Sequence, residues 1–196
     1  MKTDVLDSAE DFIRHKLIDK LPASLHYHSY EHVMDVLSAA ERIADAEDID
    51  EENKELLRIA VLFHDAGFTI QSEDHENLGC QMVRADLPQF GYSVEQIEMI
   101  CGMIQATRIP QSPHNILEQI ICDADLDYLG RDDYSVISAK LEMEIAAKKV
   151  LTEKEWLQLQ VSFLEQHKYF TRTAKDTREI KKEERLQVLK SRLDKV

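Results

Sequence analysis

Three segments place ionisable side chains within apolar sequence, where they could perform chemistry. The segment HYHSYEHVMDV (residues 26–36) holds three of the chain's eight histidines within seven residues. In AVLFHDAGF (residues 60–68) the only polar residues are His64 and Asp65, and ICDADLDYLG (residues 121–130) contains three aspartates. Imidazoles and carboxylates that face a common interior can hold a divalent cation or transfer protons. Their positions on the predicted helices therefore decide which of them can act together.

The pair of polar residues in the second segment is predicted to face the protein interior. Residues 55–67 form a helical pattern that is apolar nearly all round, in which Val61 and His64 share a face and Asp65 lies one turn beyond Val61. We expect Gly67 to end this helix in a left-handed conformation, so that the pair occupies the last turn, where the helix dipole favours a cation. A buried carboxylate needs a partner or a metal, and a hydrogen-bonded histidine–aspartate pair in the core is the alternative.

The third segment offers one carboxylate to the same interior. Asp125 lies one turn after Ile121 and one turn before Tyr128, so it borders the apolar stripe of its helix. Asp123 projects from nearly the opposite side. We expect Asp123 and Asp127 to face solvent or to support the ligands from behind.

A fourth side chain, His32, completes a candidate metal site. It lies one turn before Val36, at the margin of an apolar stripe, and can join His64, Asp65 and Asp125 around one ion. Two imidazoles and two carboxylates suit manganese, iron, zinc or, less well, magnesium. With water in the open positions, such an ion would lower the pKa of that water and generate a hydroxide nucleophile near neutral pH.

The elements that must position these residues are helices. Only five glycines and four prolines occur in 196 residues, which disfavours a fold made of many turns, and no strand pattern is present. The apolar spacing and the capping residues predict an all-α chain with helices at about 4–19, 29–44, 55–67, 76–87, 93–105, 114–128, 132–149, 152–163 and 173–193. The apolar stripe of the first helix includes Val5. Capping boxes are predicted at Ser93 with Gln96 and at Thr152 with Glu155.

Composition sets the expected class and surroundings of the protein. Residues 1–196 are expected to form one domain, with an N-terminal helix (1–20), a core that carries the candidate site (26–130) and C-terminal helices (131–196). The chain contains no apolar run of 18 residues and no signal-peptide pattern, so we expect a soluble cytoplasmic protein. The three cysteines, Cys80, Cys101 and Cys122, have neither zinc-site nor disulfide spacing and are expected to be buried thiols.

The charge of the chain argues against nucleic-acid binding. The net charge is −14, and phosphate backbones require clustered cations. Residues 166–196 nevertheless hold 10 Lys and Arg against 5 Asp and Glu. We interpret this basic C-terminal helix as one that docks on the acidic body of the same chain. No nucleic-acid polymer and no membrane is expected as a partner, and a homodimer stays open.

The order of His32, then His64-Asp65, then Asp125 resembles the H…HD…D signature of the HD superfamily of metal-dependent phosphohydrolases, an all-helical family. The separations are 32 residues from His32 to His64 and 60 residues from Asp65 to Asp125, within the usual range of the family. The resemblance covers residues 26–130. It implies a single-domain bundle of about eight or nine helices and a divalent metal held by these four residues. It also implies hydrolysis of a phosphoester of a nucleotide, a cyclic nucleotide or a related small molecule.

A narrower resemblance concerns the proton donor. The segment YHSYEHVMDV is similar to the segment before the first metal ligand in cyclic-nucleotide phosphodiesterases. It implies that His28 is the general acid that protonates the leaving oxygen, while Asp65 holds the metal and the attacking water. An imidazole suits this role because its ordinary pKa lies near 6.5. The alternative for His28 is a surface residue just ahead of a helix cap at Ser29.

A second metal is a weaker implication of the same family. His75 and Glu76 lie in a segment that resembles the third histidine segment of HD proteins with two metals, but His75 follows His64 by only 11 residues and Thr107 stands where a histidine would be expected. We expect His75 and Glu76 to support the ligands or the substrate. His114 is either a further ligand or a surface residue next to a cap.

Cations should meet the negative charge of a phosphoester substrate. Arg108, Lys168 and Arg172 are the candidates, and solvated surface side chains are the alternative for each of them. Two other functions stay open. One is an HD-fold oxygenase with two irons, which would need both His75 and His114 as ligands, and the other is a metal-binding regulatory module without turnover.

Overall fold

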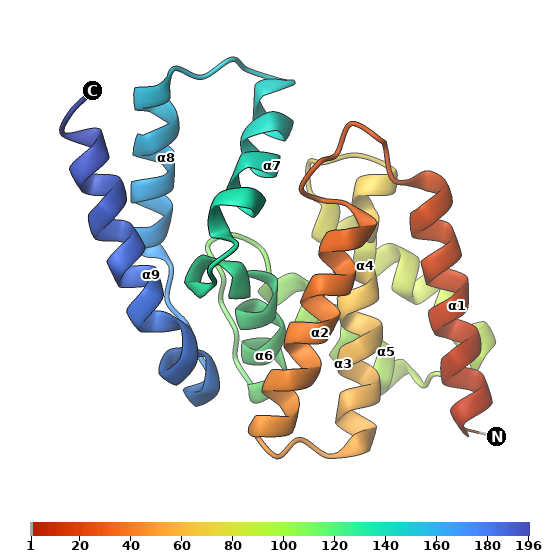
Figure 1. Cartoon of the computed structure of the whole chain (residues 1–196). Coiled ribbons are helices and arrows are strands. Elements are labelled where there is room, and N and C mark those ends of the chain that lie inside the picture. Colours follow the sequence, from red (N-terminus) through yellow and green to blue (C-terminus); the bar gives the residue numbers. More distant parts are fainter. Residues whose placement is uncertain (1) are drawn as a thin grey trace.

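The described chain is built from helices alone. The computed structural model describes the backbone of residues 2–196 and the side chains of residues 8–196, so the predicted burial of Val5 lies outside the described side chains. The α-helices of this part of the chain are α1 (Lys2–Lys20), α2 (Tyr30–Ala46), α3 (Glu51–His64), α4 (His75–Asp86), α5 (Val94–Ala106), α6 (Ile116–Asp125), α7 (Tyr134–Ala146), α8 (Glu153–Gln166) and α9 (Arg172–Leu193). Three short 3₁₀-helices accompany them: η1 (Ala66–Thr69), η2 (Leu87–Phe90) and η3 (Asp127–Gly130). The predicted all-α fold is confirmed (Figure 1).

Side-chain caps fix where several of these helices begin. Ser29 caps α2 by accepting a hydrogen bond from the backbone N–H of His32, and Asn115 caps α6 in the same way through Glu118. Both predicted capping boxes are present, at the start of α5 and at the start of α8. These short-range signals explain why most predicted helix starts fall within a few residues of the observed ones.

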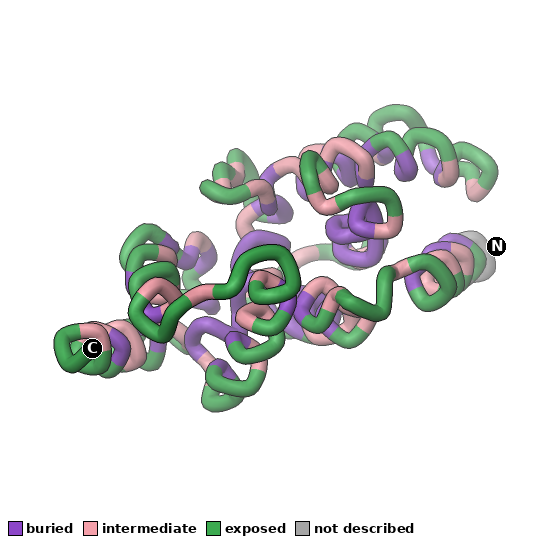
Figure 2. Tube along the Cα trace, turned by 90° about the horizontal axis from the view of Figure 1, so that it is seen from above, coloured by how far each residue is buried: buried purple, intermediate pink, exposed green. Residues whose placement is uncertain are grey.

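Helix α3 lies at the centre of the larger of two hydrophobic clusters. Every residue from Ile59 to His64 is buried, and the helix packs against α1, α2, α4, α5 and α6. Figure 2 shows the buried stretches of chain turned inward from an exposed rim. This cluster draws its members from α1 to α6 and includes Ile13, Ile43, Phe63, Ile100 and Ile120.

The smaller cluster belongs to the C-terminal third of the chain. Helices α7, α8 and α9 lie on the side of the molecule away from α1, with α6 between them and the N-terminal helices (Figure 1). Tyr27, from the segment before α2, packs into this cluster together with Leu129, Leu157, Leu164 and Leu189. The end of α6 and the start of α2 therefore meet at the boundary between the two clusters.

Two aspartates tie the C-terminal third to the end of α6. Asp123 is fully buried and accepts hydrogen bonds from the backbone N–H groups of Phe170 (2.8 Å) and Thr171 (2.7 Å). Asp127 is 2 % exposed and accepts from Arg178 Nε of α9 at 2.8 Å. The expectation that either would face solvent is therefore wrong, and the hydrogen bonds of both carboxylates tie α6 to other parts of the chain. The face of α6 opposite the main cluster is covered by the segment that leads into α9, which the periodicity of one helix does not reveal.

Gly67 is needed for close packing rather than for a left-handed turn. Helix α3 ends at His64, and Gly67 lies in η1 without a positive φ, so the predicted left-handed conformation is wrong. A Cβ atom on Gly67 would lie 2.0 Å from the carbonyl oxygen of His75. The missing side chain lets the start of α4 approach the end of α3, which brings His75 to the side of Asp65.

The remaining expectations about the chain concern thiols and membranes. Cys80, Cys101 and Cys122 are buried free thiols, as expected. Across residues 2–196, no helix combines the length and apolarity that a membrane crossing would need.

The buried ion-pair cluster of Asp127 should contribute measurably to stability. Its carboxylate accepts from Arg42 Nη2 of α2 at 2.7 Å as well as from Arg178, so Asp127→Ala leaves cations without their partner. We expect a loss of about 3 kcal/mol in the free energy of unfolding, measured by urea denaturation. The matched control is Asp132→Ala. Asp132 is exposed and pairs with Lys181, which lies on α9 like Arg178, so this substitution should leave the free energy of unfolding unchanged. Equal effects of the two substitutions would contradict this account.

Candidate metal centre

The ends of three helices bring the predicted ligands together. His32 lies in the first turn of α2, His64 is the last residue of α3, and Asp125 is the last residue of α6. One ligand atom from each of these three residues lies within 4.8 Å of the other two. His32 Nε2 is 3.1 Å from Asp125 Oδ1, and His64 Nε2 is 3.7 Å from the same oxygen.

Asp65 closes the group from the position after α3. Its Oδ2 atom lies 3.3 Å from His64 Nε2 and 3.6 Å from His32 Nε2. Asp65 is buried, with 3 % of the residue exposed, as expected for a residue that follows the central apolar helix α3. The structure thus gathers all four predicted ligands, His32, His64, Asp65 and Asp125, around one point.

The hydrogen bonding of His64 shows that this point needs a positive charge. His64 Nδ1 lies 2.7 Å from the carbonyl oxygen of Val61, which can only accept, so Nδ1 must carry the proton of that bond. In the neutral imidazole, Nε2 then presents a lone pair toward the carboxylates of Asp65 and Asp125. His64 Nε2 and Asp65 Oδ2 are both buried without a hydrogen-bond partner. Such acceptors, packed against one another, are stable only with a cation between them.

The pKa shifts of the group have the same cause. Burial alone would lower the pKa of His64, but the negative charges of Asp65 and Asp125 raise it well above its ordinary value. Burial would raise the pKa of Asp65, and the charge of His64 holds it below its usual range instead. A proton shared within the cluster therefore supplies, in the protein alone, the charge that a divalent ion would supply.

The chemistry of these donors fits a divalent metal ion. Two imidazole nitrogens and two carboxylate oxygens suit manganese, iron or zinc, and magnesium less well. The backbone also favours a cation here, because α3 and α6 both end at the cluster and direct the negative ends of their dipoles to it.

A histidine held by a glutamate lies beside the cluster. His28 Nδ1 is 2.6 Å from Glu144 Oε1 of α7, and Glu144 Oε2 also accepts from the backbone N–H groups of Tyr27 (3.0 Å) and His28 (3.1 Å). Burial would lower the pKa of His28, but the hydrogen bond that its Nδ1–H donates to Glu144 and the charge of Asp65 raise it overall. The ring also stacks on Phe68 with centroids 4.1 Å apart.

Glu144 is a site residue that the sequence analysis missed. It lies more than 100 residues from His28 along the chain, on a helix without a clear apolar stripe. No local pattern marks it, because its role arises only when α7 packs over the segment before α2. Of the two interpretations of His28, the surface residue is not supported, since its imidazole lines the cavity of about 170 Å³ that also contains Asp65 and Asp125.

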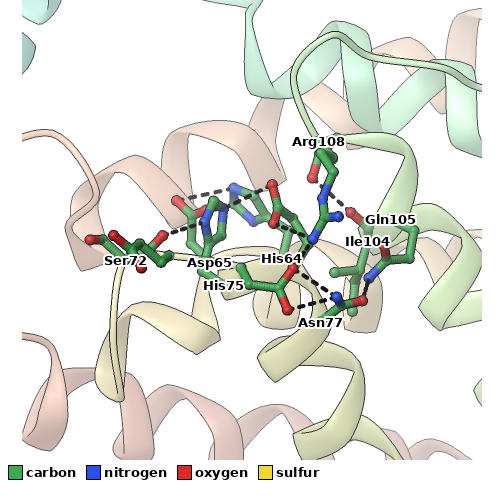
Figure 3. A network of polar contacts seen from close by, with 12 residues as sticks. His64, Asp65, Ser72, His75, Asn77, Ile104, Gln105 and Arg108 are labelled. Carbon is green, nitrogen blue, oxygen red and sulfur yellow. Dashed lines mark hydrogen bonds and ion pairs between the residues drawn. The ribbon is translucent and has the colours of Figure 1, made fainter.

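His75, Glu76 and Arg108 border the cluster. His75 Nε2 lies 3.6 Å from both Asp65 Oδ1 and Glu76 Oε1. Figure 3 shows His75 between Asp65 and Ser72, whose carbonyl oxygen is 3.2 Å from His75 Nδ1. Arg108 forms ion pairs with Asp74 and, at 3.3 Å, with Glu76 Oε2. His75 therefore lies next to the candidate ligand Asp65, Glu76 lines the same cavity, and Arg108 lies one residue further out, beyond Glu76.

Other predicted residues lie elsewhere. Arg172 is exposed and pairs with Asp176, and the next residue, Thr173, donates its N–H to Glu47 at the end of α2 opposite His32. The structure thus does not bring Arg172 to the site. His114 is exposed ahead of α6, at the end opposite Asp125, as expected of a residue next to a cap. Lys168 lines a neighbouring cavity rather than the one that holds the candidate ligands.

Metal binding should stabilise the wild-type protein and not a variant without Asp125. At a free Mn²⁺ concentration of about 100 times Kd, we expect a gain of about 2.7 kcal/mol in the free energy of unfolding. For a chain of 196 residues this corresponds to a rise of roughly 5–10 °C in Tm. Differential scanning calorimetry with and without EDTA measures the shift. Asp125→Ala should abolish it, and Asp45→Ala, at an exposed carboxylate of α2, should retain it. A full shift in Asp125→Ala would contradict the ligand assignment.

Comparisons with known proteins agree with this arrangement. The HD domain family matches residues 29–127, just over half of the chain and the segment that carries all four candidate ligands. No curated protein sequence matches the chain.

Two solved structures are similar in fold. YpgQ from Bacillus subtilis, in complex with ADP, has a TM-score of 0.66 at 20 % identity over 100 % of this chain and 96 % of that chain. A predicted HD superfamily hydrolase from an uncultured Thermotogales bacterium has a TM-score of 0.62 at 20 % identity over 96 % of this chain and 91 % of that chain. At this identity the likeness concerns the fold, and the family match covers the residues of the site. With its all-helical fold and the order of its candidate ligands, the chain belongs to the HD domain family.

Proposed function

We propose that this protein is a metal-dependent phosphohydrolase that cleaves a phosphoester of a nucleotide or a related small molecule. The observation that carries the proposal is the convergence of His32, His64, Asp65 and Asp125 around one point, beside a cavity lined by Asp65, Asp125 and an imidazole held by a glutamate. A site that can hold both a cation and a proton donor is what hydrolysis of a phosphoester requires, since the phosphoryl charge and the leaving oxygen must both be stabilised. The ADP present in the structure of YpgQ supports a nucleotide as the organic part of the substrate.

The four ligands would hold the ion, and the protein would position the water and the phosphoryl group around it. A divalent ion bound there supplies Lewis-acid chemistry, which polarises the phosphoryl oxygens and acidifies water. Asp65 remains ionised because the neighbouring imidazoles lower its pKa, so its carboxylate can accept a hydrogen bond from the attacking water. Burial of the cluster excludes bulk water and strengthens these contacts.

His28 would supply the proton to the leaving oxygen. Because Glu144 accepts a hydrogen bond from Nδ1–H, the other nitrogen, Nε2, is the one available to the substrate. The raised pKa of His28 keeps the imidazolium populated closer to neutral pH than an ordinary histidine would be. After the transfer, the neutral ring still donates from Nδ1 to Glu144, so its orientation is preserved through the reaction.

Two cations are candidates for the rest of the substrate charge. Arg108 lies at the edge of the site, where a phosphate oxygen could replace Glu76 or Asp74 as its partner. Lys168 lies further out, on the neighbouring cavity.

The geometry favours the hydrolase over the oxygenase. An HD-fold oxygenase with two irons would need His114 as a ligand, and this residue lies at the far end of α6 from Asp125. His75 can instead support a single-metal site by contacting the ligand Asp65, and Glu76 in turn contacts His75. A regulatory module without turnover would keep the same metal site and differ only in the absence of activity.

Hydrolysis should depend on both the metal and Asp65. We expect turnover of at least one substrate in a panel of mono-, tri- and cyclic nucleotides and an aryl phosphodiester, assayed with Mn²⁺, Mg²⁺, Fe²⁺ and Zn²⁺. Asp65→Ala should lower kcat/KM by a factor of 10³ or more, on the order of 4 kcal/mol of transition-state stabilisation. Activity that survives this substitution would mean that the site is elsewhere. No turnover with any pair would favour the regulatory module.

The proton-donor role of His28 should appear as a dependence on the leaving group. His28→Asn should lower kcat about 100-fold for a substrate with an alkoxide leaving group, a typical contribution of general acid catalysis. The loss should be much smaller for a p-nitrophenyl ester, because nitrophenolate departs without protonation. His26→Asn is the matched control at an exposed position two residues earlier. Equal losses on both substrates would indicate that His28 only binds the substrate.

A further inference from the structure

A second cavity lies directly beside the candidate metal centre. Its volume is about 240 Å³, and three of its lining residues, Ile109, Leu126 and Phe163, also line the cavity of about 170 Å³ that holds Asp65 and Asp125. Sites for small organic molecules usually measure about 300–1,000 Å³, so each cavity alone is small and the two together reach this range. The shared walls make them neighbouring parts of one elongated site.

The second cavity differs in character from the metal centre. Its lining holds the rings of Phe163, Phe170 and His167, the side-chain amides of Gln111 and Gln166, and the exposed residue Lys168. No carboxylate lines it, although the chain as a whole carries a net charge of −14. Aromatic faces combined with neutral donors and acceptors are suited to a planar heteroaromatic group.

His167 is the most informative residue of this lining. It is 9 % exposed, and neither Nδ1 nor Nε2 has a hydrogen-bond partner. Burial and the nearby Lys182 lower the pKa of His167 to about 3, so the ring is neutral and offers one donor and one acceptor. The edge-on contact with Tyr169, at 4.6 Å between centroids, holds the ring in place. A buried polar group without a partner is rare and calls for an explanation, such as a ligand that completes it.

We propose that this second cavity binds the nucleobase of a substrate whose phosphate lies at the metal centre. The assignment rests on the proposed function and adds to it a place and a chemistry for the organic group. The aromatic rings would stack on the faces of the base, while His167 and the two glutamines would pair with polar atoms on its edge. A hydrocarbon group would leave His167 unpaired, and a sugar alone would make little use of the aromatic faces.

Binding measurements with non-hydrolysable ligands test this directly. Isothermal titration calorimetry on the full chain with Mn²⁺ compares the α,β-methylene analogue of ADP with methylenediphosphonate, which has no base. We expect the nucleotide analogue to bind at least about tenfold more tightly, since stacking of one base is typically worth that much. Gln166→Trp, which fills the cavity, should remove this advantage. The matched control is Gln158→Trp, at an exposed position two turns earlier on α8, which should retain it.

His167→Phe separates hydrogen bonding from a structural role. The substitution keeps a ring of similar shape and removes the two unpartnered nitrogens, so Tm should stay the same or rise. The advantage of the nucleotide analogue should nevertheless fall about fivefold, the effect of losing one to two hydrogen bonds. A fall in Tm with unchanged nucleotide binding would assign His167 to structure alone and overturn its part in the subsite.

Other results would also overturn the subsite, and they differ from failure of the proposed function. An intact advantage in Gln166→Trp, or equal binding of both ligands by the wild-type protein, would contradict the nucleobase assignment even if hydrolysis occurs. A wild-type protein that shows the tenfold advantage without hydrolysing any substrate would support the subsite and reject the hydrolase.

Discussion

The placement of two carboxylates and two imidazoles in a shared, mostly buried cluster is the constraint on which the rest of the structure depends. His64 ends α3, the most buried helix of the described chain, Asp65 follows it, and Asp125 ends α6, which points to the same place. Acceptors packed this closely repel one another unless a cation lies among them. The C-terminal ends of α3 and α6 add negative dipole at the same place, so the site is electrostatically prepared for a cation before any substrate arrives.

The location of the site between two hydrophobic clusters explains how it combines different chemistries. The candidate ligands lie on or directly after helices that form the larger cluster, whereas Glu144 and the aromatic lining of the second cavity come from the C-terminal third of the chain. Asp123 and Asp127 join the two parts, through the backbone before α9 and through Arg178. Each of these carboxylates is two residues from the candidate ligand Asp125. The same end of α6 therefore binds the C-terminal third and orients the ligand.

Much of this organisation could be predicted from local sequence, and the reasons are physical. Helices were recognisable because apolar spacing and capping residues act within a few positions of one another. His64, Asp65 and Asp125 stood out as polar groups on apolar faces, where an unpaired charge is too costly to be accidental. Glu144 and His167 carried no such signal. Their roles depend on contacts between helices far apart in the chain, which the periodicity of a single helix does not encode.

The most direct test of the central claim is pulsed electron paramagnetic resonance of the Mn²⁺-loaded protein. Electron spin echo modulation from directly bound imidazole nitrogen reports the number of histidine ligands. The account predicts modulation from two histidine nitrogens in the wild-type protein and from one in His32→Gln. Absence of nitrogen modulation, or a signal unchanged by that substitution, would show that Mn²⁺ binds elsewhere and would contradict the assigned centre.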